Sequence, residues 1–102
     1  MTLKKRTEVF VCYTEGKFWQ EKTDEKGPYQ EQINVAELDQ LAKALEDPFS
    51  VLVKDLNKRT FKPLSVRAKS ISPLLDHVKH HTRQGARVKI ENSLLSVEFY
   101  KN

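Results

Sequence analysis

Only two segments of this 102-residue chain place apolar side chains at helical spacing, and strand-like segments surround both of them. The first helix is expected to begin after Asn34, whose side chain can accept a hydrogen bond from a free amide of the first turn. It is expected to end before Pro48, and Ile33 is placed to staple onto the first turn. Its outward face, which includes Asp39, is expected to be solvated. The inward stripe consists of Leu38, Leu41, Ala42 and Leu45.

The second helix is expected from about Pro73 to Gln84. Ser72 supplies a hydroxyl cap directly before a proline at the first helical position, which is a typical helix start. Gly85 stands where a left-handed residue commonly ends a helix. The inward side chains of this helix are Leu74, Leu75 and Val78.

The remaining segments are rich in β-branched and aromatic residues and are expected to be strands. Apolar residues on both faces of the first strand favour a central position for it, and Gly16 suits a tight turn after it. Asp24–Pro28 is expected to be a loop, and Pro63 favours a sheet edge. The expected strands are Thr7–Thr14, Lys17–Thr23, Tyr29–Ile33, Phe49–Leu56, Phe61–Lys69, Ala86–Glu91 and Leu94–Lys101.

This order of elements predicts an α+β fold with two helices packed on one face of a largely antiparallel sheet, because each helix has a single apolar stripe to bury. A β–α–β–β–α–β run within it is compatible with a ferredoxin-like core, carrying an extra N-terminal hairpin strand and a C-terminal hairpin. A differently connected α+β sandwich is the alternative. We expect a single domain over residues 1–102, with residues 1–6 as a flexible basic N-terminus.

The setting of the protein is expected to be cytoplasmic. Its one cysteine, Cys12, excludes an internal disulfide and suits a reducing compartment. The basic start of the chain lacks the apolar stretch of a secretory signal. No apolar run approaches the roughly 18 residues of a membrane-spanning helix, so no membrane partner is expected.

The charge of the chain is divided unevenly. Residues 1–50 contain seven Lys/Arg and ten Asp/Glu, whereas residues 51–102 contain eleven and four. A surface of one sign attracts phosphate chains and releases their counterions. We therefore expect a small non-catalytic binding module that contacts nucleic acid, DNA or RNA, or another polyanion. The opposing interpretation is that the two halves interleave in the fold and their charges cancel. The candidate nucleic-acid-binding residues are Lys58, Arg59, Phe61, Lys62, Arg67, Lys69, Arg87 and Lys89.

Four of these cations alternate along two expected strands, Arg67 with Lys69 and Arg87 with Lys89. If the two strands pair, the cations form one ladder on the sheet. Phe61 is placed to stack on a nucleobase. The segment around it, KRTFKPL, lacks the glycines and paired aromatics of an RRM strand, so contact with backbone phosphates is expected in place of base readout.

A second hypothesis is a protein-interaction module, such as an inhibitor, immunity or regulatory subunit. Aromatic residues are common anchors at protein interfaces, and the N-terminal hairpin supplies Phe18, Trp19 and Tyr29. Alternatively, Phe18 and Trp19 divide between the core and its rim. A homodimer formed by pairing of open sheet edges is a further expectation.

A third hypothesis is a small ribonuclease-like enzyme that uses His77, His80 or His81 as a base, with a phosphate held by Lys79, Arg83 or Tyr100. The chain has no Gly-rich phosphate loop and no nucleophile elbow. Two histidines at i, i+4 can share a metal ion, but no third ligand is evident. No catalytic residue, metal or cofactor is therefore predicted.

Overall fold

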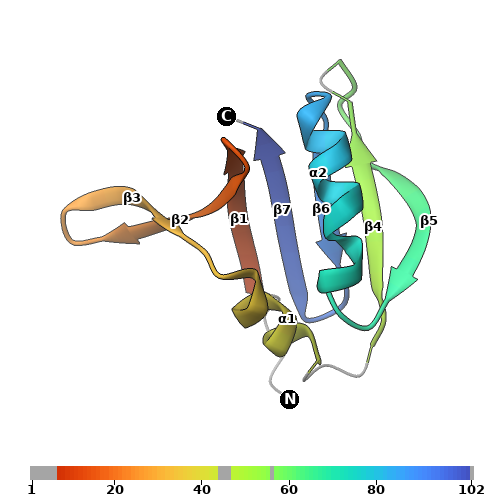
Figure 1. Cartoon of the computed structure of the whole chain (residues 1–102), viewed down its shortest axis with the longest axis horizontal. Coiled ribbons are helices and arrows are strands. Elements are labelled where there is room, and N and C mark those ends of the chain that lie inside the picture. Colours follow the sequence, from red (N-terminus) through yellow and green to blue (C-terminus); the bar gives the residue numbers. More distant parts are fainter. Residues whose placement is uncertain (1–6, 44–46, 56, 102) are drawn as a thin grey trace.

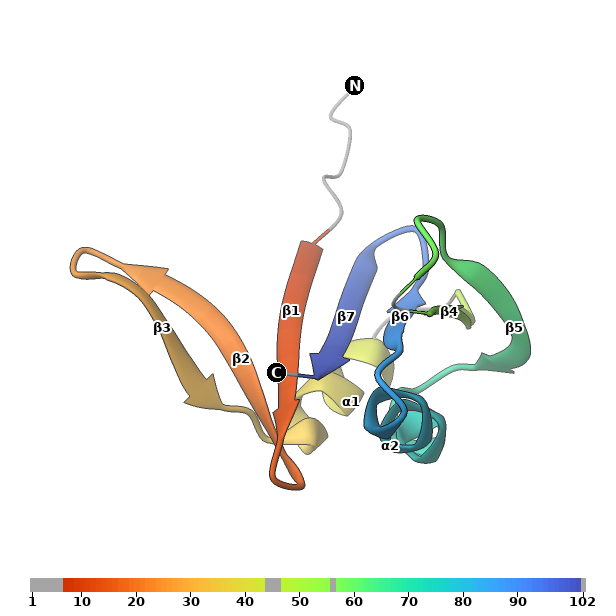
Figure 2. The same cartoon turned by 90° about the horizontal axis from the view of Figure 1, so that it is seen from above.

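The computed structural model describes residues 7–43, 47–55 and 57–101, and within them seven strands form one sheet with two helices on one of its faces (Figures 1 and 2). The predicted α+β class is confirmed. The prediction for residues 1–6 lies outside the described residues. The elements are β1 (Thr7–Thr14), β2 (Lys17–Asp24), β3 (Gly27–Gln32), α1 (Val35–Lys43), β4 (Phe49–Lys54), β5 (Lys62–Ala68), a 3₁₀ turn η1 (Ser72–Leu74), α2 (Leu75–Arg83), β6 (Arg87–Glu91) and β7 (Leu95–Lys101).

The strand order is β3-β2-β1-β7-β6-β4-β5. The β1–β7 pair is parallel, and the other neighbouring pairs are antiparallel. The ferredoxin-like core is not confirmed, because β3 and β4, the first two strands of the proposed run, are separated by β2, β1, β7 and β6. The chain instead crosses from one edge of the sheet to the far side through α1, and α2 then links the parallel strands β5 and β6 on either side of β4.

The sheet order keeps the two differently charged halves of the sequence apart. Strands β1 to β3 form one side of the sheet, strands β4 to β7 form the other, and the two sides meet at the β1–β7 pair. Figure 1 shows this division as warm colours on one side and green to blue on the other. The excess positive charge of the second half is therefore gathered mainly on the β4–β7 side of the sheet, where Asp39 and Asp47 of the first half also lie, bonded to Ser72 and Ser93.

The core lies between the helices and the face of the sheet that they cover. Alternation and register align the inward side chains of neighbouring strands, so that Val11, Phe99 and Val88 form one buried row. Leu38, Leu74 and Val78 are buried against this face and Leu75 partly so, as their spacing predicts. The predictions for Leu41, Ala42 and Leu45 lie outside the described side chains. The remaining buried core residues include Phe18, Phe49, Val51, Ile71, Ile90, Leu95 and Val97.

The two N-terminal hairpins differ from each other in how they turn. Glu15 and Gly16 have φ values of 54° and 77°, the pair of positive values that a two-residue type I′ turn requires. The second turn is shorter than the predicted loop, since Gly27 and Pro28 already pair with β2. Proline is tolerated there because β3 is an edge strand with one unpaired side. The Ile33 amide points toward β2 and donates to the Phe18 carbonyl at 3.0 Å. Because backbone amides alternate in direction along a strand, the nitrogen of Pro28 points away from β2, and no ladder hydrogen bond is lost.

The other edge strand, β5, is also poorly suited to pairing with a further strand. Pro63 lies near its start, which confirms the predicted edge position, and the β4–β5 register shifts between Ser50 and Val51. Prolines and bulges at edges are common protections against edge-to-edge association. Both edges of the sheet therefore disfavour the homodimer that the sequence suggested.

The two helices begin differently from each other. The Asn34 side chain accepts the Ala36 amide at 2.9 Å, which confirms the predicted cap. The Ser72 cap is wrong: its hydroxyl makes no capping bond, and Ile71 precedes the 3₁₀ turn. The Ser72 amide instead donates to Asp39 Oδ1 at 2.9 Å. Asp39 was expected to be solvated, but it links α1 to the start of the second helical segment.

We predict that Asp39→Ala lowers the free energy of unfolding by about 1 kcal/mol, the usual cost of losing a cap. The start of the second helical segment then has an amide without its acceptor. Urea denaturation followed by circular dichroism measures the change. Asp39→Asn keeps an acceptor oxygen and should restore most of the loss. Equal destabilisation by both variants would contradict a capping role.

Candidate polyanion-binding face

The helix-free face of the sheet, called here the bare face, carries the cations of β6. Val88 and Ile90 are buried against the helices, so Arg87 and Lys89 project from the opposite face, as alternation predicted. The β4–β6 register places Lys54 directly beside Arg87. Lys54 was not among the predicted site residues, because its neighbour is set by strand pairing that the local sequence does not reveal.

Phe61 joins this group from the loop before β5. Its ring centre lies 4.7 Å from Lys89 Nζ and 5.7 Å from Lys54 Nζ, both within cation–π range. The ring is half-buried. The side chain predicted to stack on a nucleobase therefore holds two ammonium groups together, and Lys54, Phe61 and Lys89 form one cluster on the bare face.

Three further exposed cations, Lys58, Arg59 and Lys62, lie in and after the loop that leads to Phe61. Lys58 forms an ion pair with Asp55 at 3.6 Å. The hydrogen bond and the positive charge of Lys58 lower the pKa of Lys62, and Asp55 opposes this shift only in part. A phosphate group bound between the two ammonium groups would relieve their repulsion. We call the set Lys54, Lys58, Arg59, Lys62, Arg87 and Lys89 the basic end.

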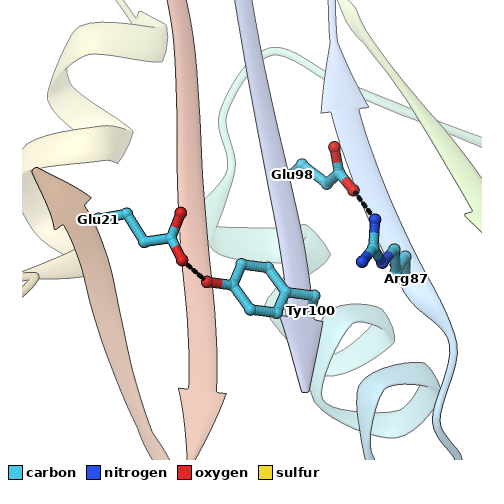
Figure 3. Close-up of polar contacts among 4 residues, drawn as sticks. All are labelled: Glu21, Arg87, Glu98 and Tyr100. Carbon is cyan, nitrogen blue, oxygen red and sulfur yellow. Dashed lines mark hydrogen bonds and ion pairs between the residues drawn. The ribbon is translucent and has the colours of Figure 1, made fainter. Parts of the chain in front are cut away.

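A second polar network adjoins the basic end on the bare face (Figure 3). The Arg87 guanidinium donates to Glu98 Oε1 at 3.3 Å, and its carbon lies 5.9 Å from the centre of the Tyr100 ring. Tyr100 reaches from β7 across β1 and donates its hydroxyl hydrogen to Glu21 on β2. Burial and the bond to Glu21 raise the pKa of Tyr100, so its hydroxyl stays protonated at neutral pH.

The predicted ladder of four strand cations does not form. Strand β4 lies between β5 and β6, so the strands of Arg67 and Arg87 are not neighbours. Arg67 pairs with Ser50, four residues along β4 from Lys54, or about 13 Å at the usual rise per residue. Arg67 and the exposed Lys69 therefore lie away from the basic end.

The three aromatic residues of the predicted protein interface do not lie together on the surface. Phe18 is 6% exposed and packs in the core, its ring centre 5.5 Å from that of Phe99, so its assignment to an interface is wrong. Trp19 is half-buried on the bare face, and Tyr29 on β3 is 42% exposed. Phe10 is equally exposed and was missed, because the sequence suggested that both faces of β1 are covered.

A surface hollow of about 390 Å³ lies between Phe10 and the half of the β2–β3 hairpin that leads to its turn. Apolar and polar side chains alternate around it, which gives it the character of a small recognition surface. Its lining residues are Phe10, Glu21, Lys22, Thr23, Pro28, Tyr29 and Gln30.

The helix histidines lie on the covered side of the sheet, on α2. Burial lowers the pKa of His81, the charges of His80 and His77 lower it further, and Asp55 opposes them. Of the three side chains that the ribonuclease hypothesis offered for the phosphate, Tyr100 projects from the opposite face, whereas Lys79 and Arg83 lie on α2 with the histidines. Within residues 7–43, 47–55 and 57–101, no three His, Cys, Asp or Glu side chains are grouped to hold a metal ion.

Cys12 is a free thiol and is buried, as predicted, but it lies on the bare-face side of β1 between Tyr100 and Trp19. Neither helix in the described part of the chain is long and apolar enough to cross a membrane.

Searches of protein-family models, curated proteins and solved structures found nothing that matches this chain.

Proposed function

We propose that this protein is a small non-catalytic binding module that holds a polyanion, with nucleic acid the leading candidate, against its basic end. The observation that carries the proposal is the cluster of Lys54, Lys89 and Phe61, with the exposed Lys58 and Arg59 in the loop before Phe61 and the exposed Lys62 at the start of β5. The fold adds support, because it gathers the half of the chain with eleven Lys/Arg and four Asp/Glu on one side of the sheet.

The physical basis of such binding is the neutralisation of phosphates by ammonium and guanidinium groups, which releases condensed counterions. Lys54, Arg87 and Lys89 project from paired strands, so their stems start from a rigid surface. The Phe61 ring further restricts the two lysines. Side chains that are already ordered lose less conformational entropy when a phosphate binds.

The test is a titration of the intact protein with labelled oligonucleotides at several salt concentrations. With about four phosphate contacts to a single strand, the logarithm of the association constant should fall with the logarithm of salt at a slope of roughly −3. A peptide nucleic acid of the same bases lacks phosphates and should bind far more weakly. No binding at low salt, or a slope near zero, would overturn the proposal.

Docking onto a protein is the second candidate function, and the exposure of Phe10 beside the hollow favours it. Exposed aromatic side chains in a shallow depression suit a partner's apolar anchor. Binding of this kind would depend little on salt. It would be lost with Trp19→Ala or Phe10→Ala, and it would survive removal of the basic end.

A further inference from the structure

Aromatic side chains line the middle of the bare face next to the basic end. Tyr100 and Trp19 both pair with Cys12, so they flank this buried residue in one row across β7, β1 and β2. Arg87 is adjacent to Tyr100, and its guanidinium lies over the Tyr100 ring. Phe10, 42% exposed, lies on the same face beside Glu98. The cations of the basic end thus adjoin a row of aromatic side chains on the same face.

The far side of the bare face has the opposite charge. On the bare face β1 and β2 carry Glu8 and Glu21 against Lys17, and the turns add Glu15, Asp24 and Glu25 against Lys26, whereas Lys22 and Glu31 form an ion pair on the other face. In Figure 2 the β2–β3 hairpin rises on the side away from the helices, at the opposite side of the sheet from β5. From one side to the other, the bare face is therefore basic, then aromatic, then acidic.

We infer that the polyanion is a single-stranded nucleic acid, with its phosphates on the basic end and its bases over Tyr100, Trp19 and Phe10. This inference rests on the proposed function and specifies its ligand. A single strand has one charged backbone and exposed bases, which match a basic side and an adjacent aromatic surface. A duplex carries phosphates on both strands and hides its base faces, so one backbone would lie against the acidic side.

Two carboxylates beside the aromatic rings, Glu98 and Glu21, also suit a single-stranded nucleic acid. Glu98 accepts one hydrogen bond from Arg87, and Glu21 accepts one from Tyr100. An ionised carboxylate has about four acceptor positions, so each retains capacity for further donors. The N–H groups on the Watson–Crick edges of unpaired bases, including N3–H of thymine and uracil, are such donors, whereas a polyphosphate chain offers none.

The experiment compares a thymine or uracil homopolymer strand of about 20 nucleotides, a duplex with the same number of phosphates, and inorganic polyphosphate. Trp19, the single tryptophan, reports stacking by quenching of its fluorescence, and anisotropy of a labelled strand reports affinity. Single strands of DNA or RNA should bind more tightly than the duplex and quench Trp19. Polyphosphate should leave its emission unchanged.

Variants at Phe10 separate stacking from charge. Phe10→Ala should weaken single-strand binding by between about fivefold and 100-fold and leave duplex binding unchanged. Phe10→Tyr keeps a ring and should retain most of the affinity. Equal affinity for all three ligands, or equal behaviour of the two variants, would overturn the single-strand inference while the polyanion function stands. No binding to any ligand would overturn both.

Discussion

Replacement of Lys54, Arg87 and Lys89 together by glutamine is expected to weaken nucleic-acid binding on the order of 100-fold near 0.1 M salt. The three side chains lie side by side on the bare face, and each lost phosphate contact removes about one released counterion. Loss of Arg87 also leaves Glu98 without a cation that now neutralises it. The slope of log affinity against log salt should become shallower by roughly 2 for a single strand.

The matched control replaces three exposed lysines outside the bare-face cluster, Lys17, Lys26 and Lys79, by glutamine. It removes the same net charge and should change affinity less than threefold, since long-range attraction is largely screened beyond about 10 Å. Thermal melting followed by circular dichroism confirms that both variants are folded. An equal loss of affinity in the two triple variants would show that net charge, not the location of the cations, governs binding.

The second large effect concerns stability. Phe99→Ala should lower the free energy of unfolding by about 3–5 kcal/mol, the range for a fully buried phenylalanine. Phe99 lies on β7, its ring contacts Phe18, and its register partner is Val11 on β1. A cavity there weakens the contact between the two sides of the sheet. Since domains of this size are typically stable by about 5–15 kcal/mol, the variant should be near its unfolding threshold.

Urea denaturation at equilibrium measures the change, and Phe10→Ala is the control. Both substitutions remove a phenyl ring from the β1–β7 pair, but Phe10 is 42% exposed and projects from the bare face. Phe10→Ala should cost about 1 kcal/mol or less. If the two variants were equally destabilised, the assignment of the covered and bare faces would be wrong.

Local patterns in the sequence predicted most of the elements, because strands and helices are set by side-chain spacing and caps. Thr7–Thr14 forms a strand with the predicted bounds, and Asn34 caps α1 as predicted. The prediction that Ser72 caps the second helix was wrong, because Ser72 lies inside a turn that begins after Ile71 and its own amide is capped by Asp39 from α1. A pattern within one segment carries no information on such a partner.

The site was less predictable than the elements. Alternation shows which residues of a strand share a face, but it does not show which strands are neighbours or which face the helices cover. Arg87 and Lys89 were placed on the correct face, yet their neighbour Lys54 follows only from the β4–β6 pairing. Phe10 lies between Val9 and Val11, whereas Phe18 lies between Lys17 and Trp19, so the neighbouring residues alone would favour burial of Phe10. Only the position of the helices makes the first exposed and the second part of the core.

The parallel pairing of β1 with β7 has a consequence for how the chain acquires its structure. Val9 lies beside Val97, 88 positions later in the sequence, whereas β1–β2, β2–β3 and β6–β7 are all hairpins. Contacts between distant residues form slowly, because the entropy of closing a long loop is lost before they stabilise the chain. During synthesis on the ribosome, the β1 edge would thus stay unpaired until β7 emerges. Joining of the two sides is then the late step of folding.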